Sequence, residues 1–170
     1  LLGTFPPGTH RWSMDFYYPN ATNDFWRIMG WIFVNDATAL YDKATRTFNL
    51  DRIKTLLDTH GIALSDTVLE ARRTRGTASD KDLEVVRMRD IPALAAEIHG
   101  LHAIATTGQK AAEIVAAQTR TSVPSMGTYI NFGDIEIWRL PSTSRAYPLA
   151  LETKVLFYRR FFAATGVIKS

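Results

Sequence analysis

The stretch Ala103-Ile104-Ala105-Thr106-Thr107-Gly108-Gln109-Lys110-Ala111-Ala112-Glu113-Ile114-Val115 decides the fold class. Its first part is a short apolar run of strand length, and after Gly108 the apolar residues recur at the spacing of an amphipathic helix. A buried strand that turns through a glycine into a helix is typical of α/β proteins. The stretch therefore predicts one strand–turn–helix unit of an open sheet.

Three further apolar runs are expected to form strands of the same sheet, namely Leu1–Phe5, Ile62–Ser65 and Ile135–Leu140. Helical periodicity lies between and after these runs. The expected helices begin near Phe25, Leu50, Ile91, Gly108 and Pro148.

This alternation predicts a three-layer α/β/α sandwich with a mostly parallel central sheet of about four strands. We expect a single domain over residues 1–170. Because Leu1 reads as part of a buried strand, we also expect a few residues to be missing before it. The polar stretch Arg72–Asp82 is expected to be a surface loop.

The composition excludes several classes of protein. The 170 residues are 46% hydrophobic and 22% charged, which is ordinary for a globular protein and unlike a disordered or fibrous chain. No apolar run approaches the roughly 20 residues that span a bilayer. Zero cysteines exclude disulfides and thiolate chemistry, and suit the cytoplasm, where we expect the protein to act. The net charge of +3 is compatible with a polyanionic partner.

Sequence motifs for dinucleotide, nucleoside triphosphate, serine hydrolase and zinc protease sites are all absent. The pair His99 and His102 has a spacing that could hold a metal on a helix, but Gly100 breaks the helix between them. We therefore expect neither a metal nor a cofactor.

Three segments carry the candidate chemistry. The first is Gly3-Thr4-Phe5-Pro6-Pro7-Gly8, in which a strand runs into a stiff turn whose backbone can approach a ligand closely. Taken alone, this segment is better explained as a plain loop.

The second segment, Phe16-Tyr17-Tyr18-Pro19-Asn20-Ala21-Thr22-Asn23-Asp24-Phe25-Trp26, sets aromatic rings and an amide just before a helix. One interpretation is a set of core aromatics followed by a helix cap, for which Asn23 is well suited. The other is a ring that stacks on a flat ligand, with an amide that holds a water or the edge of a base.

The third segment, Leu140-Pro141-Ser142-Thr143-Ser144-Arg145-Ala146, leaves a strand with three hydroxyls and a cation. Such a loop can hold phosphates through hydroxyl and backbone N–H donors. A Ser/Thr turn ahead of the next helix explains it equally well.

In their order, these segments resemble the uracil-DNA glycosylase superfamily. The patterns Gly-x-x-Pro-x-Gly, Tyr-Tyr-x-x-x-x-Asn-x-Phe-Trp and Leu-Pro-Ser-Thr-Ser are most similar to its hypoxanthine-DNA glycosylase and mismatch-specific branches. Residues 61–69 and 108–113 resemble its second strand and its third strand-to-helix turn, so the resemblance spans nearly the whole chain. It implies hydrolysis, without a metal, of the N-glycosidic bond of a damaged base flipped out of DNA.

The resemblance also implies a role for each matching residue. Asn23 falls where the hypoxanthine branch has a residue implicated in catalysis. Tyr18 falls at the ring that stacks on the base, with Tyr17 as a neighbour that can take the same part. Phe5 and Asp66 fall at positions that contact the base. DNA contacts are implied for the two loops: Pro6, Pro7, Gly8, Ser142, Thr143, Ser144 and Arg145.

Two positions depart from the family pattern. Phe5 stands where other branches have a water-activating Asp or Asn, and Leu140 stands where the uracil-specific branch has a His that stabilises the leaving anion. Both departures resemble the hypoxanthine branch, and they leave Asn23 and backbone donors with most of the chemistry.

The resemblance thus implies a monomeric, monofunctional DNA N-glycosylase that needs no cofactor. Its substrate would be DNA containing a deaminated base, either uracil or hypoxanthine, and its product an abasic site. Two alternatives remain open. One is a non-catalytic binder of damaged DNA or nucleic acid with the same fold, and the other is an α/β enzyme that acts on a free nucleoside or nucleotide.

Overall fold

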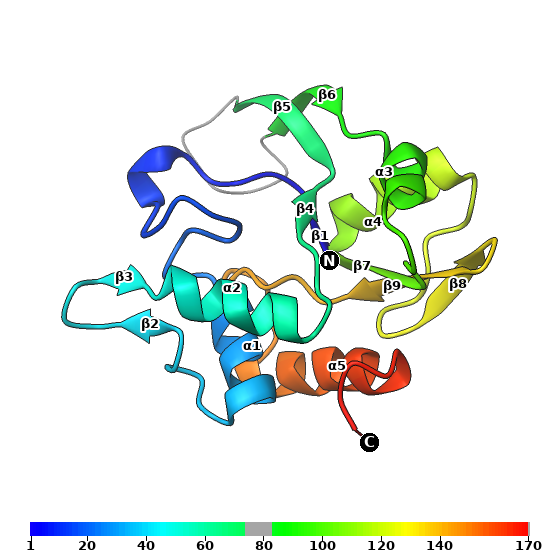
Figure 1. The fold of residues 1–170 in the computed structure, drawn as a ribbon. Helices are drawn as coiled ribbons and strands as arrows, with labels where there is room; N and C mark the ends of the chain where they lie inside the picture. Colours follow the sequence, from blue (N-terminus) through cyan, green and yellow to red (C-terminus); the bar gives the residue numbers. More distant parts are fainter. Residues whose placement is uncertain (74–82, 170) are drawn as a thin grey trace. The chain divides into compact units, whose positions relative to one another are not determined.

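The computed structural model describes residues 1–73 and 83–169 (Figure 1). The chain divides into two compact units. The sheet unit comprises Leu1–Pro6 and Leu64–Pro141, and the helical unit comprises Pro7–Ala63 and Ser142–Ser170. Each unit is therefore built from two segments that are distant in the sequence. Within the described residues, no helix is long and apolar enough to cross a membrane.

The sheet unit contains a five-stranded sheet in the order β4-β1-β7-β9-β8. Parallel pairing joins β1 to both β4 and β7, and β7 to β9. Only β8, at the edge of the sheet, pairs antiparallel. The strands are β1 (Leu2–Gly3), β4 (Ser65–Asp66), β7 (Ala103–Thr107), β8 (Tyr129–Phe132) and β9 (Ile135–Leu140).

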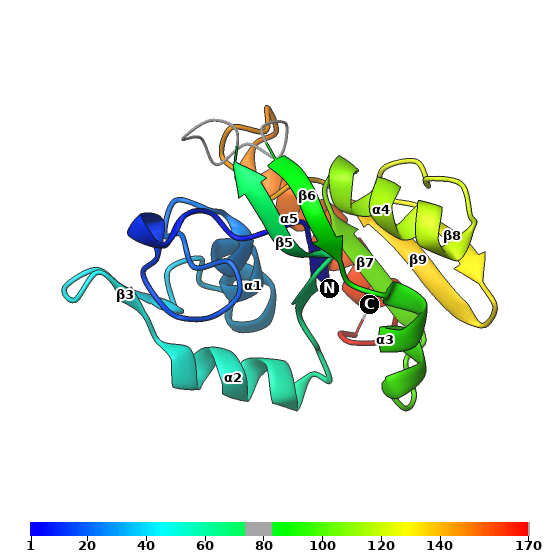
Figure 2. The same ribbon diagram turned by 90° about the horizontal axis from the view of Figure 1, so that it is seen from above.

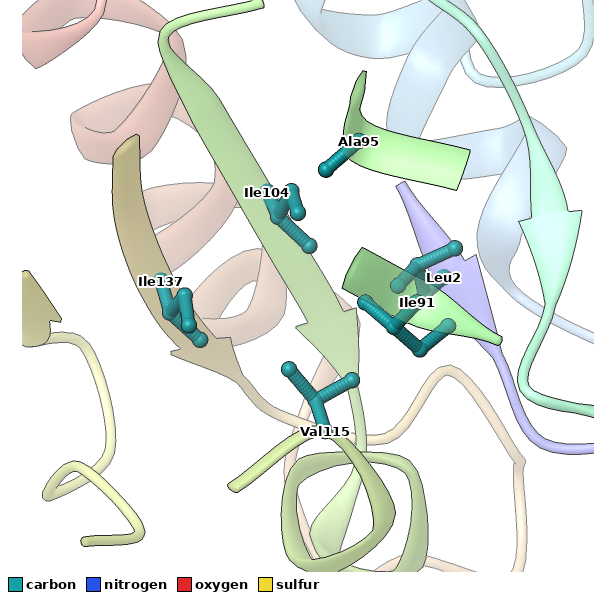
Figure 3. Close-up of a cluster of buried hydrophobic side chains, with 6 residues drawn as sticks. All are labelled: Leu2, Ile91, Ala95, Ile104, Val115 and Ile137. Atoms are coloured by element: carbon teal, nitrogen blue, oxygen red, sulfur yellow. The ribbon is translucent and has the colours of Figure 1, made fainter. Parts of the chain in front are cut away.

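Two helices pack on one face of this sheet, α3 (Ile91–Glu97) and α4 (Gln109–Thr119). The core between the sheet and these helices holds Leu2, Ile104 and Ile137 from three strands. They pack against Ile91 and Ala95 of α3 and Val115 of α4 (Figure 3). Asp90 begins α3 by accepting a hydrogen bond from the N–H of Ala93. Gly108, with a φ of 135°, makes the turn from β7 into α4 that the sequence predicted.

A second, two-stranded antiparallel sheet in this unit joins β5 (Val68–Arg73) to β6 (Leu83–Met88), as Figure 2 shows. The expectation of a surface loop over Arg72–Asp82 was therefore wrong at its start, because Arg72 and Arg73 continue β5 and pair with β6. Residues 74–82 lie outside the described part of the chain.

The predicted strands are mostly confirmed, with three corrections. The sheet has five strands rather than about four, because the sequence analysis did not predict β8. The run Ile62–Ser65 is not itself a strand: β4 begins only at Ser65, since its partner β1 is two residues long and pairs Leu2 with Ser65 and Gly3 with Asp66. For the same reason β1 is shorter than the predicted Leu1–Phe5.

The helical unit is built around helices α1 (Phe25–Val34), α2 (Leu50–Thr59) and α5 (Leu151–Ala164). It also contains the short 3₁₀ helix η1 (Thr9–Arg11) and the two-stranded sheet of β2 (Tyr41–Asp42) and β3 (Thr47–Phe48). The three long helices lie near their predicted positions.

The core of the helical unit is aromatic. Helix α1 buries Phe25, Trp26, Ile28 and Met29 at helical spacing and packs against α5. At the other end of α1, the ring of Phe33 lies 5.0 Å from that of Phe162. This packing holds α1 against α5, and the candidate chemistry of the unit lies at the start of α1.

Candidate active site

The start of α1 carries Asn23, the proposed catalytic residue. Its side-chain Oδ1 accepts a hydrogen bond of 2.9 Å from the N–H of Phe25, the first residue of the helix. The N-cap of α1 is Asp24, which makes no side-chain capping bond, so the expectation that Asn23 itself is the N-cap was off by one residue. From the position before the N-cap, Asn23 still satisfies the N–H of the first helical residue, whereas the hydroxyl of Thr22 bonds to Asn20. This hydrogen bond of Asn23 uses the amide oxygen and leaves the amide NH₂ group as the part of Asn23 with donors to offer.

Tyr18 is held in place by the residues around it. Its ring stacks almost parallel to that of Phe25, with ring centroids 3.8 Å apart and an interplanar angle of 9°. Its backbone φ of 52° is rare for a residue with a bulky side chain, and packing must stabilise such a conformation. Phe25 covers one face of the ring, so another flat group could stack only on the opposite face.

Tyr17 is oriented differently from Tyr18. Its carbonyl oxygen accepts a hydrogen bond of 3.0 Å from the indole N–H of Trp26, and its ring meets that of Phe16 edge to face at 5.2 Å. Tyr17 therefore has packing partners of its own, and Tyr18 is the ring fixed directly on the first residue of α1.

The loop Ser142–Arg145 is joined to the start of α1. The backbone N–H of Asp24 donates to the carbonyl oxygen of Thr143 over 2.9 Å. The structure therefore brings the hydroxyl-rich loop beside Asn23, although the two segments lie about 120 positions apart, as the 121-residue separation of Asp24 and Arg145 shows.

Inside the loop, hydroxyls also support the turn. The Oγ of Ser142 accepts a hydrogen bond from the N–H of Ser144, and the Oγ of Ser144 accepts one from the N–H of Ala146. These are the bonds of a Ser/Thr turn. Each hydroxyl nevertheless keeps a proton that it can donate to an anion.

A buried ion pair fastens this loop to both helices. Asp24, whose side chain is 8% exposed, accepts a hydrogen bond of 2.9 Å from the ammonium group of Lys154, which is 1% exposed. Lys154 also donates to the carbonyl oxygen of Ser144 over 2.8 Å. One lysine of α5 thus binds both the residue before α1 and the hydroxyl loop.

Two arginines complete the charged cluster. Arg27 Nη1 lies 3.2 Å from Asp24 Oδ1, and Arg145 Nε lies 3.3 Å from the same oxygen. We call Asp24, Arg27, Arg145 and Lys154 the Asp24 cluster. Only Arg145 was singled out from the sequence. The sequence did hold a signal for Lys154, which is a lysine among the apolar positions of the last expected helix. The neighbouring Val155, Tyr158 and Phe162 are all buried, and Lys154 is buried with them.

The turn at Pro7 and Gly8 also belongs to the helical unit. The indole N–H of Trp12 donates to the carbonyl oxygen of Pro7 over 2.8 Å, and η1 follows directly after Gly8. A Cβ added at Gly8 would lie 2.8 Å from the ring of His10, so the exposed side chain of His10 would have to move for a larger residue to fit.

The sheet unit carries the other candidates, Phe5, Pro6 and Asp66. Strands β1 and β4 run parallel, and beyond their last pair the N–H of Thr67 donates to the carbonyl oxygen of Gly3 and the N–H of Val68 to that of Thr4. Phe5 and Asp66 therefore lie at the carboxyl ends of adjacent strands, where open α/β sheets bind ligands. Both residues are partly buried.

Two buried side chains at strand ends bear on the chemistry available to the sheet unit. The hydroxyl of Thr67, next to Asp66, is buried and has no hydrogen-bond partner among the described residues. Leu140, at the end of β9, is completely buried and apolar. No group of three or more His, Asp or Glu side chains in the described ranges could hold a metal ion.

Comparison with known proteins supports the fold. No protein-family model matches the sequence, and no curated protein is significantly similar to it. The structure is similar to the solution NMR structure of a candidate uracil DNA glycosylase from Methanosarcina acetivorans, with a TM-score of 0.53 and 22% sequence identity. The match covers 85% of this chain and 80% of that one. It confirms the predicted fold class, an α/β protein with a mostly parallel sheet.

Proposed function

We propose that this chain is a DNA glycosylase that removes a deaminated base, uracil or hypoxanthine, and leaves an abasic site. One observation carries the proposal: the hydrogen bond from Asp24 to Thr143 sets the hydroxyl loop beside the helix start that holds Asn23 and Tyr18. A stacking ring, an amide and a group of phosphate-binding donors are what a base-flipping hydrolase needs. The likeness in fold to a candidate uracil DNA glycosylase agrees with this assignment.

The proposed reaction is hydrolysis of the bond between the base and C1′ of the sugar. The oxygen of a water forms a bond to C1′ while the bond from C1′ to the base nitrogen breaks, and the base leaves with the electron pair. The water loses one proton as it becomes the C1′ hydroxyl, and a proton ends on the departing base. Positive charge develops on the sugar and negative charge on the base. The enzyme must therefore position the water and stabilise the departing anion with fixed donors.

Each candidate residue then has a defined part. Tyr18 stacks on the flipped base, a contact worth about 1–3 kcal/mol in nucleic-acid complexes. Because Phe25 and the backbone φ of 52° already fix the ring, little freedom is lost when the base arrives. The amide NH₂ group of Asn23 holds the water or the departing base, and the carboxylate of Asp66 accepts a hydrogen bond from the N–H of uracil or hypoxanthine. Tyr17 and Phe5 are the further residues proposed to contact the base.

The backbone of the DNA is held by the loops. Ser142, Thr143, Ser144 and Arg145 contact phosphates, and the Pro6-Pro7-Gly8 turn approaches the strand through its backbone. Phosphate contacts fix the register of the protein on DNA without reading sequence. A DNA substrate would also place the protein inside the cell.

A second candidate function is favoured by Phe5 and Leu140. Leu140 is completely buried and Phe5 has no polar atom in its side chain, so neither can activate water or stabilise an anion. A protein that binds damaged DNA without cleaving the glycosidic bond would tolerate both residues.

A panel of oligonucleotides tests the proposed function. Duplexes and single strands that carry uracil, hypoxanthine, xanthine or a G·T mismatch are incubated with the protein and then treated with alkali, which breaks the strand at an abasic site. Strand breakage at uracil or hypoxanthine is the expected result. Tight binding to these oligonucleotides without breakage would instead support the binding protein, and action on free nucleosides without salt-sensitive DNA binding would support a nucleoside enzyme.

A further inference from the structure

The Asp24 cluster carries more positive than negative charge. A single carboxylate, Asp24, is surrounded by three cations, Lys154, Arg27 and Arg145. Lys154 is buried and bonds to one carboxylate oxygen, so it already balances the charge of Asp24. The two arginines crowd around the other oxygen and bring two further positive charges to the start of α1.

The geometry of the arginines leaves most of their donors available. Each guanidinium reaches Asp24 through a single nitrogen, Nη1 of Arg27 and Nε of Arg145. A guanidinium carries five N–H donors. Within residues 1–73 and 83–169, Asp24 is the only ion-pair partner that the structure gives to either arginine.

Both arginines are anchored inside and reach the solvent. Their side chains are 39% and 52% exposed, whereas Asp24 beneath them is 8% exposed. Because both donor nitrogens lie within 3.3 Å of the same carboxylate oxygen, one tetrahedral anion of phosphate size can contact both guanidinium groups. The positive end of the α1 dipole favours an anion at the same place.

We propose that Arg27 and Arg145 together bind one phosphate group of the nucleic-acid backbone, with Asp24 and Lys154 holding the two guanidinium groups ready. This inference rests on the proposed function, which supplies the DNA, and it adds Arg27 to the residues that bind it. Guanidinium groups suit phosphate because they donate two parallel hydrogen bonds to its oxygens. Lys154 keeps Asp24 balanced when the phosphate draws both arginines toward itself.

Salt titration of DNA binding tests the inference. The variants Arg27→Gln, Arg145→Gln and the double variant are compared with wild type for binding to a short duplex that holds a non-cleavable uracil analogue. Each single variant is expected to lower the slope of log affinity against log salt by about one, and the double variant by about two. The matched control is Arg159→Gln, an exposed arginine of α5 with no ion pair among the described residues. It loses the same charge and is expected to change the slope less.

Thermal melting and base release separate the possible outcomes. The melting temperatures of the single variants should stay near that of wild type, because half-exposed ion pairs contribute little. Arg27→Gln with the same salt slope as Arg159→Gln would overturn the inference, even if the wild type releases uracil. A wild type that releases no base but binds DNA with an Arg27-dependent slope would refute the proposed function and support the inference.

Inorganic phosphate distinguishes the two sources of the anion. It is titrated against wild type and the double variant, with binding followed by calorimetry. Weak phosphate binding that the double variant loses, together with the change in salt slope, is the expected result. Phosphate binding that depends on both arginines without any change in the DNA salt slope would identify a site for free phosphate and overturn the assignment to nucleic acid.

Discussion

Lys154 donates a hydrogen bond of 2.9 Å to Asp24 across 130 positions of the sequence, and both side chains are buried. Removing one partner of a buried ion pair typically costs about 3–5 kcal/mol, because the other charge is left uncompensated. We expect Lys154→Met to lower the free energy of unfolding by about 3 kcal/mol, near the low end of that range, since Arg27 and Arg145 still lie beside Asp24. Urea unfolding measures the loss.

The double variant Asp24→Asn/Lys154→Met is the control for that prediction. Removing both charges should recover part of the stability lost in Lys154→Met, because no unpaired charge then remains in the interior. Losses from the two single variants that simply add in the double variant would show that Asp24 and Lys154 do not interact as the structure indicates.

Asn23 supports the first residue of α1 with a hydrogen bond and has a proposed chemical role, and two substitutions separate these two roles. Asn23→Ala removes the oxygen that accepts from Phe25 and should cost about 1 kcal/mol of stability. Asn23→Asp keeps that oxygen and loses the NH₂ donors. It should therefore melt near the wild-type temperature while base release slows by about a hundredfold or more, the scale for losing a donor that stabilises developing charge. Single-turnover kinetics at wild-type rate in Asn23→Asp would reduce Asn23 to a support for the start of α1.

Asp66 is expected to influence which base is chosen. A carboxylate only accepts hydrogen bonds, whereas an amide both donates and accepts. Asp66→Asn should therefore change the ratio of the uracil and hypoxanthine excision rates. Competition between the two substrates in one tube measures this ratio directly. If both rates fall by the same factor, Asp66 does not contact the edge of the base.

Gly30 should resist replacement although it lies in a helix. Alanine in place of glycine usually stabilises a helix interior by about 1 kcal/mol. A Cβ at Gly30 would lie 2.5 Å from the backbone carbonyl oxygen of Asp36, where the chain turns back after α1. We expect Gly30→Ala to destabilise the protein by roughly 1–3 kcal/mol, the usual range for overpacking. A raised melting temperature would contradict this expectation.

Tyr158 links stability to high pH. Burial raises the pKa of its hydroxyl well above the ordinary value of 10.0, and Tyr18 raises it further. The folded protein therefore keeps this proton to a higher pH than the unfolded chain does. The resulting stabilisation is complete below pH 10 and declines above it, by at most about 1.4 kcal/mol per pH unit.

The variant Tyr158→Phe isolates this effect. Urea unfolding of both proteins between pH 8 and pH 11.5 gives the difference in their free energies of unfolding at each pH. That difference should be constant up to about pH 10, the ordinary pKa of tyrosine, and then shift against wild type. Parallel curves over the whole range would show that Tyr158 does not titrate differently in the two states.

The sequence predicted the helices of the fold better than its strands. Strand β8 was missed because the search followed short buried runs, and β8 alternates between exposed and partly buried residues at the edge of the sheet. A signal was present: Gly133 and Asp134 separate Phe132 from Ile135, which pair directly. Two such turn residues between strand-forming runs are typical of a hairpin.

Only part of the candidate site was predicted, because some of its contacts join residues that are far apart in the sequence. Asn23 and the hydroxyl loop were identified from local patterns, and the structure joins them. The Asp24 cluster was not, because a buried ion pair over 130 positions has no periodicity to reveal it. The position of Lys154 among apolar residues of α5 was a signal that it is buried, but its partner Asp24 is known only from the packing of the helix.

The division of the helical unit into two segments has a consequence for how the protein folds as it is synthesised. Helix α1 leaves the ribosome before its partners on α5, which follow only after the whole of residues 64–141 has been translated. Until then Asp24 is without Lys154 and the apolar face of α1 is uncovered. Closing so long a loop makes folding slow relative to helical proteins with local contacts. The packing of α1 therefore depends on α5, and the interval between the synthesis of the two helices leaves α1 exposed to aggregation and to chaperones.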